Sequence, residues 1–131
     1  NFFIVKNGEI LTPEGKNILR GITRDYIFTL AEELNIPCKE CNIEPYDVYE
    51  ADEAFVTSTP FCILPAVKLN GLKIGDGKPG KITKNLLKAW SDLVGVDIVK
   101  QIESWDVKNN KKAGTTPYKF AENNTLTKDN E

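Results

Sequence analysis

Two Asn-Gly dipeptides, at residues 7–8 and 70–71, constrain the fold of this chain more than any other feature. Each dipeptide lies between short runs of residues that favour strands. Because Asn and Gly both tolerate positive φ, Asn-Gly forms the tight turn whose twist matches that of two antiparallel strands. The sequence therefore predicts one hairpin from residues 2–5 and 10–12, and a second from residues 62–69 and 72–74.

Two apolar stripes at helical spacing predict two main helices. The first predicts a helix over residues 23–34, which Asn35 and Pro37 end because Asn accepts a left-handed conformation and Pro cannot continue a helix. The second predicts a helix over residues 82–94, and its pattern extends through residue 105. The stripes consist of Ile22, Tyr26, Ile27, Leu30, Ala31 and Leu34, and of Ile82, Leu86, Leu87, Trp90, Leu93, Val94, Ile98, Ile102 and Trp105.

The remaining segments complete a mixed α/β pattern. Strand-forming residues predict strands over residues 36–43 and 54–58, with a short helical turn over residues 45–50 between them. From residue 106 to residue 131 the apolar pattern stops, so we expect a polar tail that is flexible or draped over a neighbour. The expected fold is therefore one mixed α/β domain of the α+β type over residues 1–105, with antiparallel hairpins among the helices.

The absence of His excludes several chemistries. A chain of 131 residues without His has no Ser-His or Cys-His nucleophile pair and no imidazole metal ligand. Its 17 basic and 19 acidic residues give a net charge of −2, which argues against nucleic-acid or membrane-surface partners. It also has no Met, even at the start, so we expect part of a longer gene product.

The three cysteines predict a reducing, cytoplasmic location rather than a reactive site. Cys38, Cys41 and Cys62 are odd in number and follow no secretory signal. Cys38 and Cys41 have CxxC spacing, but a zinc site needs a second pair or His, and a strand points these two residues to opposite faces. A redox motif of this type opens a helix, whereas here Pro37 precedes it. We therefore expect a structural role and no metal site.

Two segments are candidate anion sites. Gly21-Ile22-Thr23 stands at the start of the first predicted helix, where free backbone N–H groups and the helix dipole attract phosphate. Thr57-Ser58-Thr59-Pro60 is a hydroxyl-rich turn after a predicted strand. Helix capping explains the first segment equally well, and ordinary turn chemistry explains the second. Taken singly, neither segment decides between the two explanations.

Several short motifs occur in a fixed order along residues 1–105. The first set comprises Asn1-Phe2-Phe3, Ile10-x-Thr12 and Leu19-x-Gly21-Ile22-x-Arg24. The second set comprises Ala51-Asp52-Glu53-Ala54-Phe55, Thr57-Ser58-Thr59, Pro65 and Gly75-x-Gly77-x-Pro79-Gly80. Together they resemble the class IV pyridoxal-phosphate aminotransferases, which include branched-chain amino acid aminotransferase, D-amino acid transaminase and aminodeoxychorismate lyase. The resemblance implies the C-terminal domain of the fold-type IV enzymes.

The resemblance also implies roles for the residues of both candidate segments. It implies that Gly21 and the backbone amides of Ile22 and Thr23 hold the phosphate of pyridoxal 5′-phosphate. The hydroxyl and amide of Thr59 would complete this site beside Ser58, and Leu19 would pack on a face of the pyridine ring. Thr59 and Pro60 would lie beside the substrate carboxylate, although Pro60 has no N–H to donate.

The resemblance assigns no catalytic residue to this chain. In the family, the lysine that forms the Schiff base and an arginine that pairs with the phosphate lie well upstream. The glutamate that keeps the pyridine nitrogen protonated would lie about five residues before Asn1. We therefore expect the C-terminal part of a longer enzyme, inactive by itself, whose N-terminal domain is a further segment of the same polypeptide.

The implied activity of the complete enzyme is transamination. The leading substrates are branched-chain amino acids with 2-oxoglutarate, and a homodimer is implied. D-amino acid transamination and aminodeoxychorismate lyase activity are the alternatives within the family. A stand-alone, non-catalytic domain that binds a phosphorylated ligand or a partner is a further alternative, as is a homologue that has lost its catalytic lysine.

Overall fold

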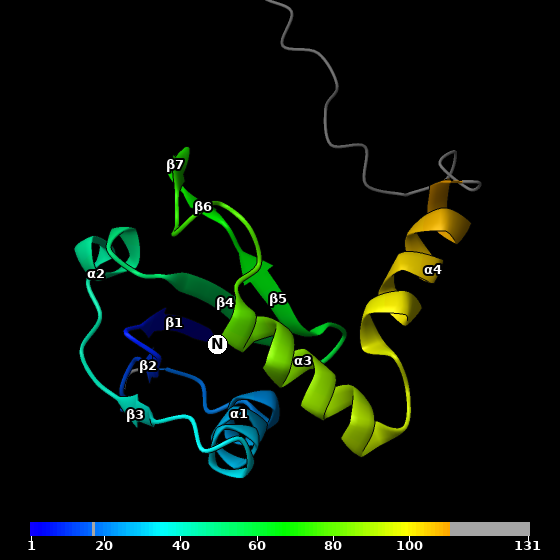
Figure 1. Cartoon of the computed structure of the whole chain (residues 1–131), viewed down its shortest axis with the longest axis horizontal. Coiled ribbons are helices and arrows are strands. Elements are labelled where there is room, and N and C mark those ends of the chain that lie inside the picture. The colour runs from blue at the N-terminus through cyan, green and yellow to red at the C-terminus, as the bar shows by residue number, and fades with distance from the viewer. Residues whose placement is uncertain (17, 111–131) are drawn as a thin grey trace, which may run out of the picture.

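A five-stranded sheet with the strand order β3-β2-β1-β4-β5 forms the centre of the computed structural model (Figure 1). The structure describes residues 1–16 and 18–110. The strands are β1 (Phe2–Lys6), β2 (Glu9–Thr12), β3 (Cys38–Glu40), β4 (Glu53–Ser58) and β5 (Cys62–Ala66), with a separate pair β6 (Lys68–Leu69) and β7 (Leu72–Lys73). The helices are α1 (Ile22–Glu33), α2 (Pro45–Tyr49), α3 (Lys81–Val94) and α4 (Ile98–Asn110). The predicted mixed α/β class is confirmed.

Both predicted hairpins are present. Asn7 and Gly8 have φ values of 51° and 79°, and they join β1 to β2 with Lys6 opposite Glu9. Asn70 and Gly71 have φ values of 49° and 79° and join β6 to β7. The arm predicted over residues 62–69 is divided into β5 and β6, and only β6 pairs within this hairpin.

The main core lies between one face of the sheet and the helices α1, α3 and α4. Phe3 and Phe55 are opposite each other on β1 and β4, fully buried, with their rings stacked 4.9 Å apart between centroids. Burial of a side chain of this size contributes about 2–3 kcal/mol. The other buried members of this cluster are Val5, Ile10, Ile27, Leu30, Ala31, Ile63, Leu86, Leu87, Trp90 and Ile98. This core fixes α1 and α3 on the sheet.

A smaller cluster covers the opposite face. Ile4 and Ala54 alternate along β1 and β4 with the phenylalanines of the main core, so their side chains point the other way. They pack with Val48 of α2, with Ala51 and with Ile74. The sheet is therefore covered on both faces, as its almost continuous apolar strands require.

Glu53, at the start of β4, caps α3. Its carboxylate accepts hydrogen bonds from the backbone N–H groups of Ile82 (2.9 Å) and Thr83 (2.8 Å), and from the Thr83 hydroxyl (2.7 Å). A Cβ on Gly80 would lie 1.9 Å from the carboxylate carbon, so only glycine allows this approach. Gly75 plays a similar part, since its Cβ would lie 2.1 Å from the Asp52 carbonyl oxygen. The glycine-rich motif therefore serves packing here.

The prediction that the second helix extends through residue 105 is wrong. The helix ends at Gly95, which has the left-handed φ of 69° typical of a helix C-terminus. A separate helix, α4, begins at Ile98, whose N–H donates to the Ser91 hydroxyl at 3.2 Å. The fold therefore has four helices in its described part, where two main helices and a helical turn were expected.

Two further boundaries differ from the expected ones. The strand expected over residues 36–43 is limited to β3, which runs parallel to β2 rather than in a hairpin, with α1 as the crossover. The helical pattern continues to Asn110, whereas the polar tail was expected to begin at residue 106. Whether the tail is flexible or draped concerns residues 111–131, which lie outside the described residues.

Candidate anion-binding site

The first turn of α1 leaves backbone donors without helical partners. Its N-cap, Gly21, has extended backbone angles, and its carbonyl accepts from the N–H groups of Arg24 (3.0 Å) and Asp25 (3.3 Å). Among the described residues no side chain caps this turn, in contrast to α3, which Glu53 caps. The N–H groups of Ile22 and Thr23, the first two helical residues, have no acceptor within a helix. They are therefore available to an anion, as the sequence predicted.

Large apolar side chains surround these donors and are exposed. Leu19 is 88% exposed and Ile22 is 77% exposed, while Thr23 is half-buried. An apolar residue exposed to this degree in a well-packed domain indicates a surface that a ligand or another part of the protein covers. The surroundings of the α1 N-terminus thus combine polar backbone donors with apolar side chains, which is the usual make-up of a small-molecule site.

Asn1 links this turn to β4. Its side-chain NH₂ donates to the Leu19 carbonyl oxygen at 2.8 Å, and its side-chain oxygen accepts from the Gly21 N–H at 3.3 Å. Its backbone nitrogen donates to the Thr57 carbonyl at 2.9 Å, and its carbonyl accepts from the Thr57 N–H at 2.8 Å. One residue thereby joins the two candidate segments that the sequence singled out.

The second segment is the turn between β4 and β5. Ser58 is half-buried, whereas Thr59 and Pro60 are exposed, and the Phe61 N–H donates to the Ser58 carbonyl at 3.2 Å. Thr57, just before this turn, is 5% exposed, and its hydroxyl oxygen has no hydrogen-bond partner among the described residues. A buried hydroxyl of this kind is unusual and favours a polar ligand nearby.

Arg24 places a buried positive charge in the first turn of α1. The residue is 3% exposed, and its guanidinium donates to the Pro13 carbonyl (3.3 Å) and to the Glu40 carboxylate. Its guanidinium carbon also lies 5.1 Å from the centre of the Phe28 ring. The hydrogen bond from Arg24 lowers the pKa of the Glu40 carboxyl below its usual value. Arg24 therefore binds α1 to β3 and to the loop that precedes α1.

The cysteines show no sign of a reactive or metal-binding role. All three are free. Cys38 packs against the main core, and burial raises the pKa of its thiol to about 11. Cys41 follows the end of β3, and its N–H donates to the Thr12 carbonyl at 2.9 Å. Within residues 1–16 and 18–110, no group of three or more His, Cys, Asp or Glu could hold a metal ion.

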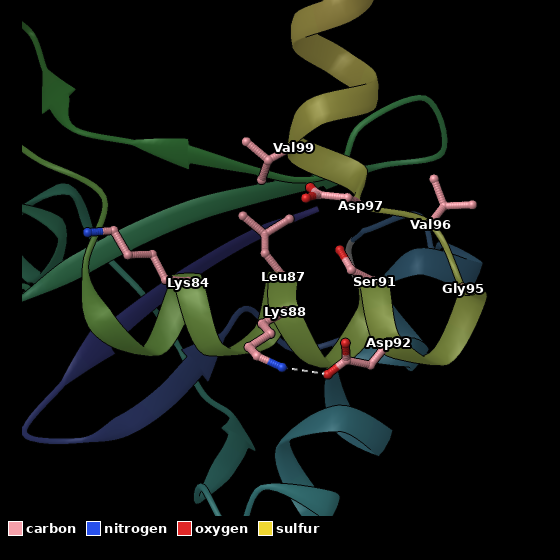
Figure 2. Close-up of a pocket in the computed structure, with 9 residues that line it drawn as sticks. All are labelled: Lys84, Leu87, Lys88, Ser91, Asp92, Gly95, Val96, Asp97 and Val99. Carbon is pink, nitrogen blue, oxygen red and sulfur yellow. Dashed lines mark hydrogen bonds and ion pairs between the residues drawn. The ribbon is translucent and has the colours of Figure 1, made fainter.

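A groove between α3 and α4 was not predicted from the sequence. It has a volume of about 640 Å³ and combines apolar side chains such as Leu87 and Val99 with the ion pair of Lys88 and Asp92, at 2.8 Å (Figure 2). It forms because the chain turns at Gly95 (Figure 2). The only available signal was that glycine, which periodicity alone passes over. None of the predicted site residues lines this groove.

The family of this chain is decided by its first half. Residues 1–69 match the family model described as amino-transferase class IV. The chain belongs to the class IV aminotransferase family. The motifs from Asn1 to Pro65 all lie within the matched segment, so the resemblance inferred from them is confirmed.

Curated class IV relatives share substantial identity with this chain. A branched-chain-amino-acid aminotransferase of Pseudomonas aeruginosa is 47% identical over 94 residues, which cover 72% of this chain and 31% of the relative. A D-alanine aminotransferase of Listeria monocytogenes is 41% identical over 87 residues, covering 66% of this chain and 30% of the relative. This chain therefore spans about a third of the length of the curated relatives that it matches.

Solved class IV structures have the same fold. The branched-chain amino acid aminotransferase of Escherichia coli superposes with a TM-score of 0.69 at 38% identity, over 71% of this chain and 31% of that one. The branched-chain enzyme of T.th., solved with pyridoxamine 5′-phosphate, gives a TM-score of 0.68 at 28% identity, over 72% and 32%. The expected class IV fold is confirmed. In the described part of the chain, no helix has the length and apolar character to cross a membrane.

Proposed function

We propose that residues 1–105 are the C-terminal cofactor-binding domain of a pyridoxal-phosphate-dependent aminotransferase, followed by a separate C-terminal tail. The observation that carries this proposal is the uncapped first turn of α1, which Asn1 joins to the Thr57–Pro60 turn. The family membership supports it, because class IV enzymes use this cofactor. A solved relative is described with pyridoxamine 5′-phosphate and another with PLP.

The residues present fit the phosphate group of the cofactor. Phosphate binds best where several donors converge, and the N–H groups of Ile22 and Thr23 are free of helical partners. The exposed hydroxyl of Thr59 supplies a further donor, since it follows the strand residue that Asn1 holds beside α1. Leu19, 88% exposed, offers an apolar surface for one face of the pyridine ring. Gly21 lets the chain pass close to Asn1 without a side chain in the way.

In this proposal the domain binds and orients rather than transferring protons. When bound, pyridoxal 5′-phosphate supplies a ring that accepts the electron pair of a bond breaking at the substrate's α-carbon. Ile22, Thr23 and Thr59 hold its phosphate, and the side chains of Leu19 and Ile22 exclude water from the ring. Ser58 and Thr59 lie where backbone N–H groups meet the substrate carboxylate. Pro60, which has no N–H, limits that contact.

The complete enzyme, in this proposal, transfers the amino group of a branched-chain amino acid to 2-oxoglutarate. The branched-chain relatives of Pseudomonas aeruginosa and Methanocaldococcus jannaschii favour this substrate class. The D-alanine aminotransferases of Listeria favour a D-amino acid as the second candidate. The catalytic lysine, the phosphate-pairing arginine and the ring-pairing glutamate belong to an upstream domain, and the enzyme is a cytoplasmic homodimer.

Thr59 provides the test of this function. Pyridoxine 5′-phosphate lacks the aldehyde, so it reports the phosphate site without reacting with lysines. We expect it to raise the melting temperature of the chain in a saturable manner, whereas pyridoxine, without the phosphate, does not. Thr59→Val removes only the hydroxyl and should weaken the affinity about tenfold, because a hydrogen bond to a charged group is lost.

Thr29→Val is the matched control, because Thr29 is also exposed but lies farther along α1. It should leave the affinity unchanged. Equal affinities of Thr59→Val and the unsubstituted chain would remove Thr59 from the site. Equal responses to pyridoxine and pyridoxine 5′-phosphate would contradict the phosphate site as a whole.

A further inference from the structure

Asn1 uses both ends of its side-chain amide on one short loop. The NH₂ group donates to the Leu19 carbonyl and the oxygen accepts from the Gly21 N–H, two residues later. Among uncharged side chains, only Asn and Gln carry such a donor and acceptor side by side on one planar group. The loop that enters α1 is thereby held at two points that flank Arg20, immediately before the first helical turn.

The backbone of Asn1 fixes the other side of this connection. Asn1 and Thr57 exchange two hydrogen bonds of 2.8 and 2.9 Å, which continue the β1–β4 pairing beyond Phe2 and Val56. Asn1 is therefore a rigid part of the sheet, and its side chain transmits that rigidity to the entry of α1. Through this residue the orientation of the Ile22 and Thr23 N–H groups depends on the sheet.

Gly21 is required by this arrangement and not by its own backbone conformation. Its φ of −79° and ψ of 145° are accessible to any residue. A Cβ at this position, however, would lie 2.7 Å from the side-chain oxygen of Asn1. An alanine would thus force Asn1 away from the loop, so the two residues form one unit.

We propose that Asn1 is a positioning residue for phosphate binding, which sets the first turn of α1 against β4 so that the N–H groups of Ile22 and Thr23 converge with Thr59. This inference rests on the proposed function and adds to it a residue that does not itself touch the phosphate. Asn1 acts through the Leu19–Gly21 loop. Gly21 is its structural counterpart.

A double-mutant cycle tests this unit. The dissociation constant for pyridoxine 5′-phosphate is measured by NMR titration of the unsubstituted chain, Asn1→Ala, Gly21→Ala and the double variant. Each single substitution should weaken binding about tenfold, because each breaks the same pair of hydrogen bonds. The double variant should also lose about tenfold, rather than the roughly hundredfold expected of independent sites. The amide shifts of Ile22 and Thr23 on binding should shrink in all three variants.

Asn70→Ala is the matched control for a purely structural effect. The side chain of Asn70 donates to the Tyr49 hydroxyl at 2.9 Å, in a turn on another part of the fold. This variant should lower the melting temperature and leave the dissociation constant unchanged. Gly21→Ala retains an accessible backbone conformation, so a well-dispersed spectrum of that variant keeps the test valid even where Asn1→Ala lowers stability.

The outcomes separate this inference from the proposed function. If the unsubstituted chain gives no phosphate-dependent shift at Ile22 and Thr23, the proposed function fails and this inference fails with it. If that chain binds and Asn1→Ala binds equally well, only the positioning role is overturned. Additive losses in the double variant, or an equal loss in Asn70→Ala, would also overturn it.

Discussion

At the scale of single residues, glycine and carboxylate positions determine how the helices meet the sheet. Glu53 provides all the side-chain capping of α3 in the described part of the chain, through three hydrogen bonds. Gly80 makes room for that carboxylate. The sequence contained both residues within motifs shared with the family, but their mutual contact joins positions far apart in the chain. Spacing along the sequence therefore did not predict the cap.

We predict that Glu53→Ala lowers the free energy of unfolding by about 2 kcal/mol, because two backbone N–H groups of α3 lose their acceptor. Urea unfolding monitored by circular dichroism measures the change. Glu33→Ala, which removes an exposed carboxylate at the end of α1, is the control and should stay within about 0.5 kcal/mol. Equal effects of the two substitutions would mean that the cap does not stabilise α3.

At the scale of elements, local patterns predicted what local forces determine. Both Asn-Gly turns form hairpins, because the turn residues fix the strand direction by themselves. The range of β3 and its parallel pairing with β2 depend on a partner beyond α1, so the apolar run over residues 36–43 did not reveal them. The break at Gly95 escaped the prediction because the apolar spacing continues across it, from Val94 to Ile98.

The contact between α1 and β3 predicts a dependence of stability on pH. The hydrogen bond from Arg24 lowers the pKa of Glu40 in the folded chain below its value in the unfolded chain, which is about 4.3 for Glu. A carboxyl group with a lowered folded pKa stabilises the fold above its unfolded pKa. This contribution is lost as the pH falls through the folded pKa. The stability difference between the unsubstituted chain and Glu40→Gln should therefore be greatest near neutral pH and shrink below about pH 4.

Urea unfolding of both proteins from pH 7 to pH 3 measures this difference. Glu32→Gln, an exposed carboxylate on α1, accounts for the general effect of removing one negative charge. A difference between the unsubstituted chain and Glu40→Gln that stays constant over this range would show that the ion pair with Arg24 does not stabilise the folded state.

At the scale of the whole molecule, the domain has one face that its own residues leave uncovered. Leu19 and Ile22 are exposed beside free backbone donors, and the chain spans about a third of the length of its curated relatives. The sequence predicted both anion-binding segments, because each carries a local signal. It did not show that Asn1 joins them, since the hydrogen bonds from Asn1 reach residues up to 56 positions away. The α3–α4 groove escaped prediction for the same reason.

The measurement that tests the phosphate site most directly is a map of amide chemical shifts, recorded while pyridoxine 5′-phosphate is added to the chain. The proposed site predicts the largest shifts at Ile22, Thr23 and Thr59, with tighter binding above about pH 6, where the phosphate carries its second charge. Shifts concentrated instead around Leu87 and Val99 in the α3–α4 groove, or no saturable shift at the start of α1, would contradict it.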